Sequence, residues 1–299
     1  MSVNSRVNVS AKVRGFVDLM KLRVVELLLV STLPAMVLAE GGLPSLSLTV
    51  ATLIGGTLAA GSANAFNMVI ESESDKLMKR TAKRPLATGL LTKSQAIVFA
   101  TVIGVISLIV FQIYTTNLAT ILTAIAIVFY VWVYTILLKK RTSQNIVWGG
   151  AAGCMPALIG WAAVTNSLSV TAWSFFLVIF FWTPPHFWAL AIHRRDDYAK
   201  VDVPMLPVTH GIQYTKLNIL LYTIIMFVVT LLPFATRLSG WLYLLGAIVL
   251  GVGFLYWAIV LMIGKNENAP METFKYSIIY LMALFLIMLV DHWIVPPLP

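Results

Sequence analysis

The stretch from residue 67 to residue 86 is the densest polar segment in the sequence. Within it, Asn67, Glu71 and Asp75 are spaced four residues apart, so on a helix each step advances only about 40° and all three share one face. Amide and carboxylate oxygens are the ligands that Mg²⁺ prefers. Basic residues that suit a phosphate group follow directly: Lys76, Lys79, Arg80, Lys83 and Arg84. Metal ligands beside phosphate ligands predict a site for a metal-bound diphosphate.

A second polar segment begins at residue 193. His193 and Asp197 are four residues apart with Asp196 between them, so a helix that continues through them would carry another polar face. Asp202 follows, and Pro204 then prevents further helix. If the two polar helix ends face each other, their oxygen ligands could hold a diphosphate between two Mg²⁺ ions. The alternative is that both are ordinary solvated helix ends, although carboxylates within a membrane are costly and usually functional.

The elements that position these residues are predicted to be membrane helices. Of 299 residues, 59% are hydrophobic and 11% charged, and the mean hydropathy is +0.88, which excludes a soluble globular domain. Apolar runs of about 20 residues recur along the chain, so we predict an all-α, polytopic bundle. The single cysteine, Cys154, excludes an intramolecular disulfide and a cysteine-rich metal site. Nine spans are expected, at about 24–40, 48–70, 94–114, 117–138, 145–164, 169–192, 216–236, 240–263 and 274–294.

The distribution of basic residues predicts the orientation of this bundle. With nine spans, twenty of the 21 Lys and Arg residues fall on one side, and the exception is Arg237. The positive-inside rule then predicts a cytoplasmic N-terminus and a C-terminus outside. The same rule accounts for the net charge of +9, so a nucleic-acid partner is not expected. The basic segments are the N-terminus and the loops at 71–93, 139–144, 193–216 and 264–275.

The chain divides into three predicted parts. Residues 1–23 lack the features of a signal peptide and are expected to lie as an amphipathic segment on the membrane surface. Residues 24–294 form one membrane domain with active-site loops at 67–93 and 193–216, and residues 295–299 form a short tail. Because no convincing organelle transit segment is present, a bacterial inner membrane is the expected location.

The motifs resemble those of a known family. The pattern N-x₃-E-x₃-D followed by KRT-x₂-RPL is similar to the first diphosphate motif of the UbiA superfamily of intramembrane prenyltransferases. The segments YTILLKKRTSQNIVWGGAAGCMPALIGW (134–161) and WTPPHFWALAIHRRDDYAKVDVPMLPV (182–208) resemble signatures of its haem O synthase branch, the protohaem IX farnesyltransferases. The similarity extends over essentially the whole chain from about Asp18.

This resemblance implies a reaction. A farnesyl group would pass from farnesyl diphosphate to a vinyl group of haem b, with addition of water, giving haem O and diphosphate. Mg²⁺ is the implied cofactor, as two ions bound through the diphosphate, and haem b is a substrate. The lipid bilayer and a haem A synthase or terminal oxidase assembly are the candidate partners. The alternatives are prenylation of a quinone precursor or chlorin, a secondary transporter, and a membrane haem chaperone.

The resemblance also implies roles for individual residues. Where many relatives carry D-x₃-D in the second motif, this chain has His193 in the first position, which suits an acid, base or diphosphate donor better than a Mg²⁺ ligand. The implied catalytic residues are His193, Asp196 and Asp197. The implied metal ligands are Asn67, Glu71, Asp75, Asp197 and Asp202. The implied diphosphate contacts are Lys79, Arg80, Lys83, Arg84 and Lys200.

Candidates for haem contact lie deeper in the chain. His186 follows Pro184 and Pro185, which should kink the helix and free backbone carbonyls, so His186 could contact haem or simply bond to a freed carbonyl. Arg23 or Lys21 could hold a haem propionate.

Three further groups have two interpretations each. The cations at 139–141 could assist the diphosphate or act only as topology anchors. The aromatic residues between 175 and 188 could line a substrate pocket or face lipid. Gly149, Gly150 and Gly153 are expected to allow close helix packing.

Overall fold

The structure is a computed structural model that describes residues 9–78, 81–201, 203–264 and 266–294, the side chains of residues 23–29 excepted. Across these ranges the regular elements are all helices, which confirms the predicted all-α class. Their bounds are α1 (Val9–Met20), α2 (Leu22–Glu40), α3 (Leu46–Asp75), α4 (Lys93–Tyr114), α5 (Asn117–Val128), the π-helix η1 (Phe129–Leu138), α6 (Asn145–Thr165), α7 (Val170–His193), α8 (Arg195–Ala199), α9 (Leu206–Thr209), α10 (Gly211–Thr230), α11 (Leu232–Ala235), α12 (Trp241–Ile263) and α13 (Ala269–Ile294).

Eight helical segments of the described chain are long and apolar enough to cross a membrane, and they coincide with the second to ninth predicted spans. The first predicted span corresponds to α2. Among the described residues of α2, the apolar helical stretch is Val30–Glu40, which is shorter than the eight spanning segments. The chain is therefore a multi-pass membrane protein. The largest differences in bounds are five residues: α3 continues to Asp75 rather than ending near residue 70, and α10 and α13 begin at Gly211 and Ala269 rather than near residues 216 and 274.

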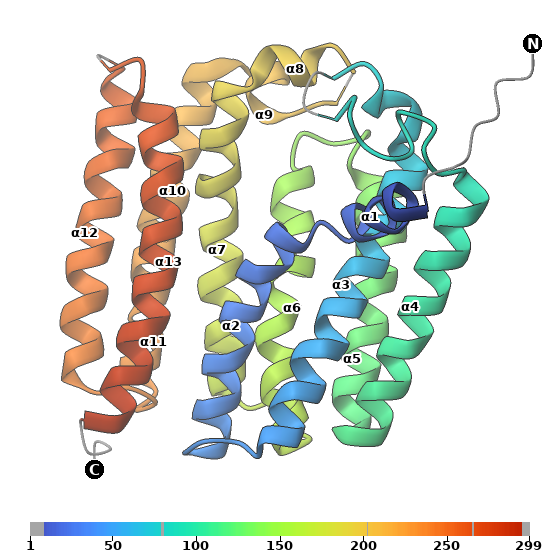
Figure 1. Ribbon diagram of the computed structural model, residues 1–299. Coiled ribbons are helices and arrows are strands. Elements are labelled where there is room, and N and C mark those ends of the chain that lie inside the picture. The colour runs from blue at the N-terminus through green and yellow to red at the C-terminus, as the bar shows by residue number, and fades with distance from the viewer. Residues whose placement is uncertain (1–8, 79–80, 202, 265, 295–299) are drawn as a thin grey trace, which may run out of the picture.

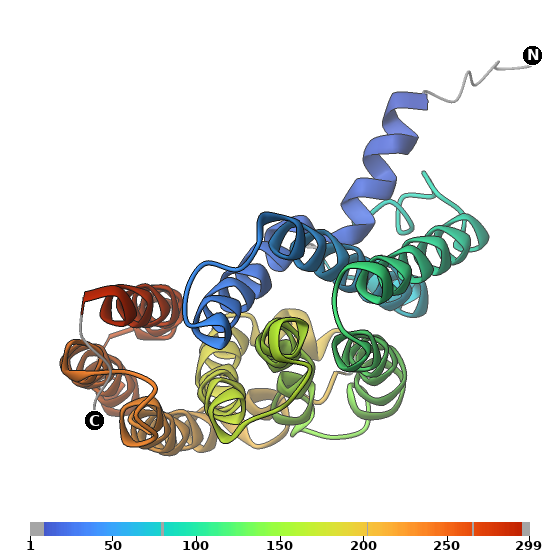
Figure 2. The same ribbon diagram turned by 90° about the horizontal axis from the view of Figure 1, so that it is seen from below.

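The long helices run side by side, and the polar connections gather at one end of the bundle (Figure 1). That end carries α8, α9, the α3–α4 loop and the α12–α13 turn, whereas the α11–α12 turn lies at the opposite end. Figure 2 shows α6 and α7 in the middle of the bundle, with α1 extending outward from it. This arrangement agrees with the predicted gathering of basic segments on one side.

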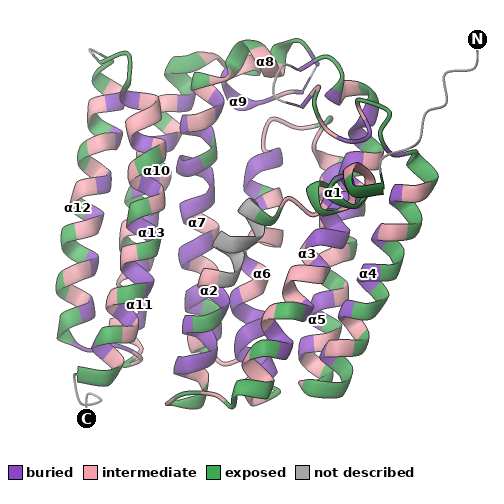
Figure 3. Ribbon diagram, in the orientation of Figure 1, coloured by how far each residue is buried: buried purple, intermediate pink, exposed green. Residues whose placement is uncertain are grey.

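Burial separates central helices from peripheral ones. In their most apolar windows, α6 and α7 are each 61% buried, against 22–39% for the other six spanning segments. Exposed apolar residues follow the outer faces of the bundle (Figure 3). Because lipid is as apolar as these side chains, such faces suit contact with the bilayer. Consequently α6 and α7 form the walls against which a buried site can be built.

Side-chain caps fix where several spans begin. Ser45, Thr116 and Ser169 each accept a hydrogen bond from the backbone N–H three residues later, at the start of α3, α5 and α7. Thr92 and Gln95 form a capping box at the start of α4. These caps set the register of the faces that α3 and α7 turn toward the bundle interior.

Candidate functional site

A cavity of about 470 Å³ lies inside the bundle, and one face of α3 forms a long part of its wall. The α3 residues that line it extend along one face of the helix from Thr52 to Asp75. At 1.5 Å per residue, Thr52 to Asp75 covers about 35 Å of helix. The wall changes character along this length: small apolar residues such as Ala59 and Ala63 give way to Asn67, Glu71 and Asp75. The cavity therefore suits a molecule with an apolar body and a polar end.

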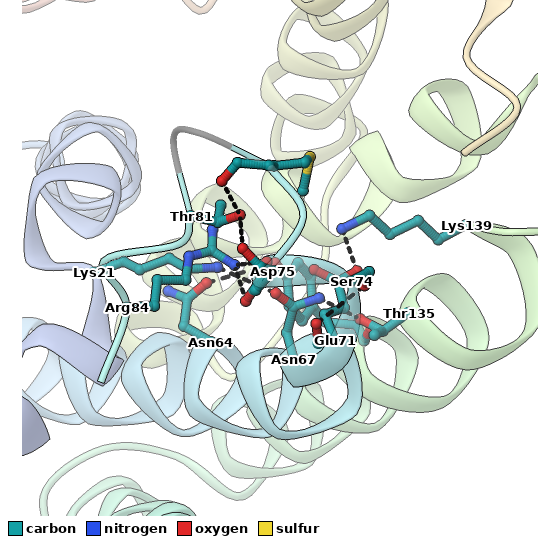
Figure 4. A network of polar contacts seen from close by, with 12 residues as sticks. Lys21, Asn64, Asn67, Glu71, Ser74, Asp75, Thr81, Arg84, Thr135 and Lys139 are labelled. Atoms are coloured by element: carbon teal, nitrogen blue, oxygen red, sulfur yellow. Dashed lines mark hydrogen bonds and ion pairs between the residues drawn. The ribbon is translucent and has the colours of Figure 1, made fainter. Parts of the chain in front are cut away.

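The three predicted metal ligands on α3 do share one face, and each is paired with a cation (Figure 4). Asn67, Glu71 and Asp75 are 1%, 8% and 1% exposed. Arg84 Nη1 donates to both carboxylate oxygens of Asp75, at 2.7 and 2.6 Å. Lys139 pairs with the Glu71 carboxylate, and Lys21 Nζ donates to Asn67 Oδ1 at 3.1 Å. Cationic and oxygen-bearing groups therefore meet at one end of the cavity.

The α3–α4 loop places Arg84. Thr81 Oγ1 donates to the carbonyl of Asp75 at 2.9 Å, and the Arg84 N–H donates to the Thr81 carbonyl at 2.9 Å. Leu86 and Leu91 of this loop are buried, so its described part from residue 81 onward packs against the bundle. The loop thereby folds Arg84 back over the end of α3.

The π-helix η1 places a second cation, Lys139. In η1 the Lys139 N–H bonds to the carbonyl of Tyr134, five residues earlier, at 2.8 Å. Thr135 Oγ1 donates likewise to the Tyr130 carbonyl at 2.9 Å, and it accepts a bond from Asn67 Nδ2 at 3.3 Å. Both tyrosines line the cavity. π-Helical turns are rare and frequently occur at functional sites.

Lys21 enters the site at the break between α1 and α2. It adopts a left-handed conformation with φ of 52°, and Asn64 Nδ2 donates to the preceding carbonyl of Met20 at 3.1 Å. Burial, together with the nearby cations of Arg84 and Lys139, lowers the pKa of Lys21 to about 7. An anionic ligand would relieve this crowding of positive charge.

The charges that line the cavity favour an anion. Among the described lining residues, five cations face only the two carboxylates of Glu71 and Asp75. Arg194 is one of these cations, and its Nε is buried with no hydrogen-bond partner in the described chain. The five cations are Lys21, Arg84, Lys139, Lys140 and Arg194.

The second polar cluster lies beside the cavity and not in it. His193, Asp196 and Asp197 line a separate surface depression, and Arg194 borders both that depression and the cavity. The expected continuous helical face through this segment is wrong, because α7 ends at His193 and Arg194 adopts φ of −112° and ψ of 23°. Asp196 and Asp197 instead occupy the first turn of α8, where carboxylates are favoured by the helix dipole.

Several predicted residues are not brought into the cavity. Lys83 is exposed and absent from the lining, and Lys200 is exposed and lies 3.8 Å from Asp197. Lys79, Arg80, Asp202, the Arg23 side chain and the predicted tail 295–299 lie outside the described residues. Within the part of the chain that is described, no three His, Cys, Asp or Glu side chains are grouped closely enough to hold a metal ion.

His186 lies in the less polar part of the cavity wall. It is 5% exposed, and its Nδ1 lies 2.6 Å from Ser277 Oγ, so its partner is a hydroxyl on α13 rather than a freed carbonyl. Helix α7 remains helical through both prolines before it. Of the aromatic residues between 175 and 188, only Trp182 and Phe187 line the cavity, while the others described there pack elsewhere.

The three glycines of α6 differ in their surroundings. A Cβ at Gly149 would lie 2.4 Å from the ring of Tyr134, and one at Gly150 would lie 2.9 Å from the side chain of Thr183. Both glycines therefore permit close packing, as predicted. Gly153 has no neighbour within 4 Å of such a Cβ and lines the cavity, so packing does not explain it.

Residues beyond the predicted set also shape the polar end. Asn64, Tyr130, Tyr134 and Thr135 bond to, or lie beside, the predicted ligands. Asn64 lies three residues before Asn67, so the helical period could have revealed it. The tyrosines carried no comparable signal, since their positions depend on the π-helix.

Comparison with known proteins places this site in a family. Residues 28–288 match the UbiA prenyltransferase family. A protein of Saccharophagus degradans named protoheme IX farnesyltransferase is 48% identical over 283 residues, covering 95% of this chain and 93% of the relative. One of Legionella pneumophila with the same name is 50% identical over 280 residues, covering 94% and 95%.

Solved structures share the fold. A digeranylgeranylglyceryl phosphate synthase superposes with a TM-score of 0.79 at 16% identity, covering 94% of this chain and 99% of that chain. A UbiA homologue from Archaeoglobus fulgidus bound to DMAPP and Mg²⁺ superposes with a TM-score of 0.66 at 14% identity, covering 92% and 99%. The family match over most of the sequence and the two relatives at 48% and 50% identity lead to one conclusion: the chain belongs to the UbiA prenyltransferase family.

Proposed function

We propose that this chain transfers a farnesyl group from farnesyl diphosphate to a vinyl group of protohaem IX, with addition of water, to give haem O and diphosphate. The observation that carries the proposal is one cavity that joins a cation-rich polar end to a long apolar wall. A prenyl diphosphate likewise has a charged diphosphate group at one end and a long apolar tail. The acceptor is proposed because relatives about 50% identical over nearly the whole chain are named protoheme IX farnesyltransferase.

The cations of the polar end serve the leaving group. A vinyl group is a weak nucleophile, so breaking the C–O bond of the allylic diphosphate is the demanding step. The bonding electrons leave with the diphosphate, whose bridging oxygen gains negative charge. Arg84, Lys139 and Lys21 would stabilise that charge, and Lys140 and Arg194 also line the cavity. Fixed positive charges near an oxygen that gains negative charge in the transition state lower the activation barrier.

The residues of α3 fit Mg²⁺ chemically. Asn67, Glu71 and Asp75 offer hard oxygen atoms on one buried face, and proteins usually supply only one or two carboxylates to Mg²⁺ when phosphate oxygens supply the rest. When bound, Mg²⁺ would neutralise diphosphate charge, and we infer two ions. Arg84 and Lys139 pair with the same carboxylates, so these buried charges are compensated.

The second cluster is proposed to act at the mouth of the cavity. Arg194 borders both the cavity and the depression formed with His193, Asp196 and Asp197, so the two regions adjoin. Asp197 and Asp202 would supply further metal ligands, and His193 a proton donor to the diphosphate. The proposed outer diphosphate contacts are Lys79, Arg80, Lys83 and Lys200.

The apolar wall serves the carbon chemistry. Apolar residues and glycines make up most of this wall, which would limit water where the allylic cation forms. The terminal vinyl carbon then bonds to the farnesyl carbon, leaving a cation on the carbon next to the porphyrin. One water adds there and loses a proton, which gives the hydroxyl group. Trp182, His186 and Phe187 on α7 line this part of the cavity and would contact the porphyrin.

We place the enzyme in the bacterial inner membrane, with the polar end of the cavity at the cytoplasmic face. The support is the concentration of Lys and Arg residues in the connections at that end. The diphosphate donor would then enter from the cytoplasm, where it is soluble, and its tail would extend toward the bilayer centre.

The test is an acceptor comparison with the purified protein. Supplied with farnesyl diphosphate and Mg²⁺, it should release diphosphate and form haem O from haem b, and leave 4-hydroxybenzoate unmodified. Product from the aromatic acid alone would contradict the acceptor. Haem binding without consumption of the donor would indicate a haem chaperone, and Mg²⁺-independent substrate flux in vesicles would indicate a transporter.

A further inference from the structure

His186 is held in one orientation by two helices. Its Nδ1 lies 2.6 Å from Ser277 Oγ, and Trp182 Nε1 donates to the Ser277 carbonyl at 2.8 Å. Trp182 and Phe274 stack on the imidazole, with centroids at 4.2 and 4.6 Å and interplanar angles of 19° and 28°. Phe187 meets it edge-on at 4.8 Å. A ring with this many fixed neighbours cannot turn without losing several of them.

The hydrogen bonds also fix the tautomer. Ser277 Oγ donates its single hydrogen to the Phe274 carbonyl at 2.6 Å, so toward His186 it can only accept. Nδ1 must therefore carry the ring proton, and Nε2 of the neutral ring keeps its lone pair. Within the described residues no group forms a hydrogen bond to Nε2. This nitrogen is also not fully enclosed by protein atoms. Because His186 lines the cavity, the lone pair is open to it.

This is the arrangement of a metal-ligating histidine. Such a residue binds through one ring nitrogen and almost always donates its other N–H to an oxygen, which fixes the tautomer and raises the basicity of the ligand. A neutral imidazole is also the commonest protein ligand of haem iron in oxygen-binding and peroxidase haem proteins. Aromatic rings surround the imidazole, and the two carboxylates that line the cavity, Glu71 and Asp75, lie at the polar end.

We propose that His186 Nε2 is an axial ligand of the haem iron while the acceptor is bound. The inference rests on the proposed function, since it assigns a contact to the acceptor of that reaction. Iron coordination would fix the porphyrin in the cavity through its centre and leave the vinyl groups at its edge free to meet the farnesyl carbon. Ser277 is then a positioning residue, which acts through the orientation of His186.

The experiment compares two porphyrins that differ only in the metal. Haem b and metal-free protoporphyrin IX are titrated into the full-length protein in lipid nanodiscs, and absorption and electron paramagnetic resonance spectra identify the axial ligand. The wild type should give a histidine-ligated haem spectrum. H186A should lose that spectrum and bind haem at least about tenfold more weakly, while its affinity for protoporphyrin IX stays within about twofold of wild type. Added imidazole should restore the spectrum.

Three further variants separate ligation from folding. H186M keeps a side chain of similar length and should give a sulfur-ligated spectrum. S277A should keep histidine ligation but shift the iron–histidine stretching frequency and weaken haem binding by about tenfold. His210 is exposed in a loop and stacks on Tyr214, so H210A is the matched control and should behave as the wild type.

Two results would overturn the ligand assignment. One is a haem spectrum and affinity in H186A equal to those of the wild type. The other is an equal loss of affinity for haem and for protoporphyrin IX, which would mean that His186 only shapes the pocket. Haem O formation measured on the same preparations separates the two proposals. If haem O forms but the haem spectrum does not depend on His186, only the ligand assignment is contradicted. If haem binding depends on His186 but no haem O forms, only the proposed reaction is contradicted.

Discussion

Replacing Asp75 by Asn tests the proposed metal and diphosphate end. Asp75 is 1% exposed and accepts two bonds from Arg84 Nη1, at 2.7 and 2.6 Å. D75N keeps the volume of the side chain and removes its charge, and it places an amide where the guanidinium needs an acceptor. The Arg84 side chain, which is 15% exposed, is then left without its counter-charge beside Lys21.

Two losses of similar size but different origin are expected. Removing one partner of a buried ion pair costs about 3–5 kcal/mol of folding stability, and the partial exposure of Arg84 places this pair near about 3 kcal/mol. Removing a group that helps to hold charge in the transition state costs about 2.7–4 kcal/mol in activation free energy, or roughly 10²- to 10³-fold in kcat. A single variant does not separate these losses.

A double-mutant cycle does separate them. Adding R84Q to D75N replaces the ion pair by a neutral amide pair, which should recover most of the unfolding free energy, while turnover should stay at least about 10²-fold below wild type. Unfolding is followed in detergent with guanidinium chloride, and diphosphate release is followed with farnesyl diphosphate, Mg²⁺ and haem b. If the double variant regains turnover to within about tenfold of wild type, the pair is structural and the reasoning fails.

Further predictions concern the second cluster, the apolar wall and the metal. Asp197 pairs with Lys200 at 3.8 Å on an exposed surface, so D197N should change stability by at most about 1 kcal/mol, whereas turnover should fall at least about tenfold if the cluster acts on the diphosphate; wild-type turnover would count against that role. Gly153 faces open cavity, so G153A should be tolerated, whereas G153L should impair use of farnesyl diphosphate more than of dimethylallyl diphosphate in a diphosphate-release assay; equal impairment of both donors would show that the side chain does not meet the prenyl tail. Chelation with EDTA should abolish diphosphate release and added Mg²⁺ should restore it, and release that persists in EDTA would disprove the metal requirement.

The span pattern and the α3 site were predictable because both depend on local periodicity. Apolar runs of membrane length identified the spans, and a spacing of four placed Asn67, Glu71 and Asp75 on one face. The family resemblance, carried by residues 67–86, 134–161 and 182–208, was confirmed by the family match and by the relatives.

The rest of the site depends on contacts between distant residues or on unusual backbone. Glu71 and Lys139 are 68 positions apart, and their meeting requires the π-helix that ends at Leu138. Lys21 reaches Asn67 through a left-handed residue between two helices, which no side-chain pattern announces. The end of α7 at His193 was not predicted, because His193 and Asp197 keep a helical spacing of four although the helix is interrupted between them.

The central claim is that this chain makes haem O, and the haem content of membranes tests it most directly. Membranes from a host without its own haem O synthesis, with and without this chain, are extracted and their haems are analysed by mass spectrometry. The account predicts a new haem heavier than haem b by one farnesyl group and one hydroxyl group, present only with the active chain and absent with D75N/R84Q. Unmodified haem b in both membranes, from a correctly inserted protein, would contradict it.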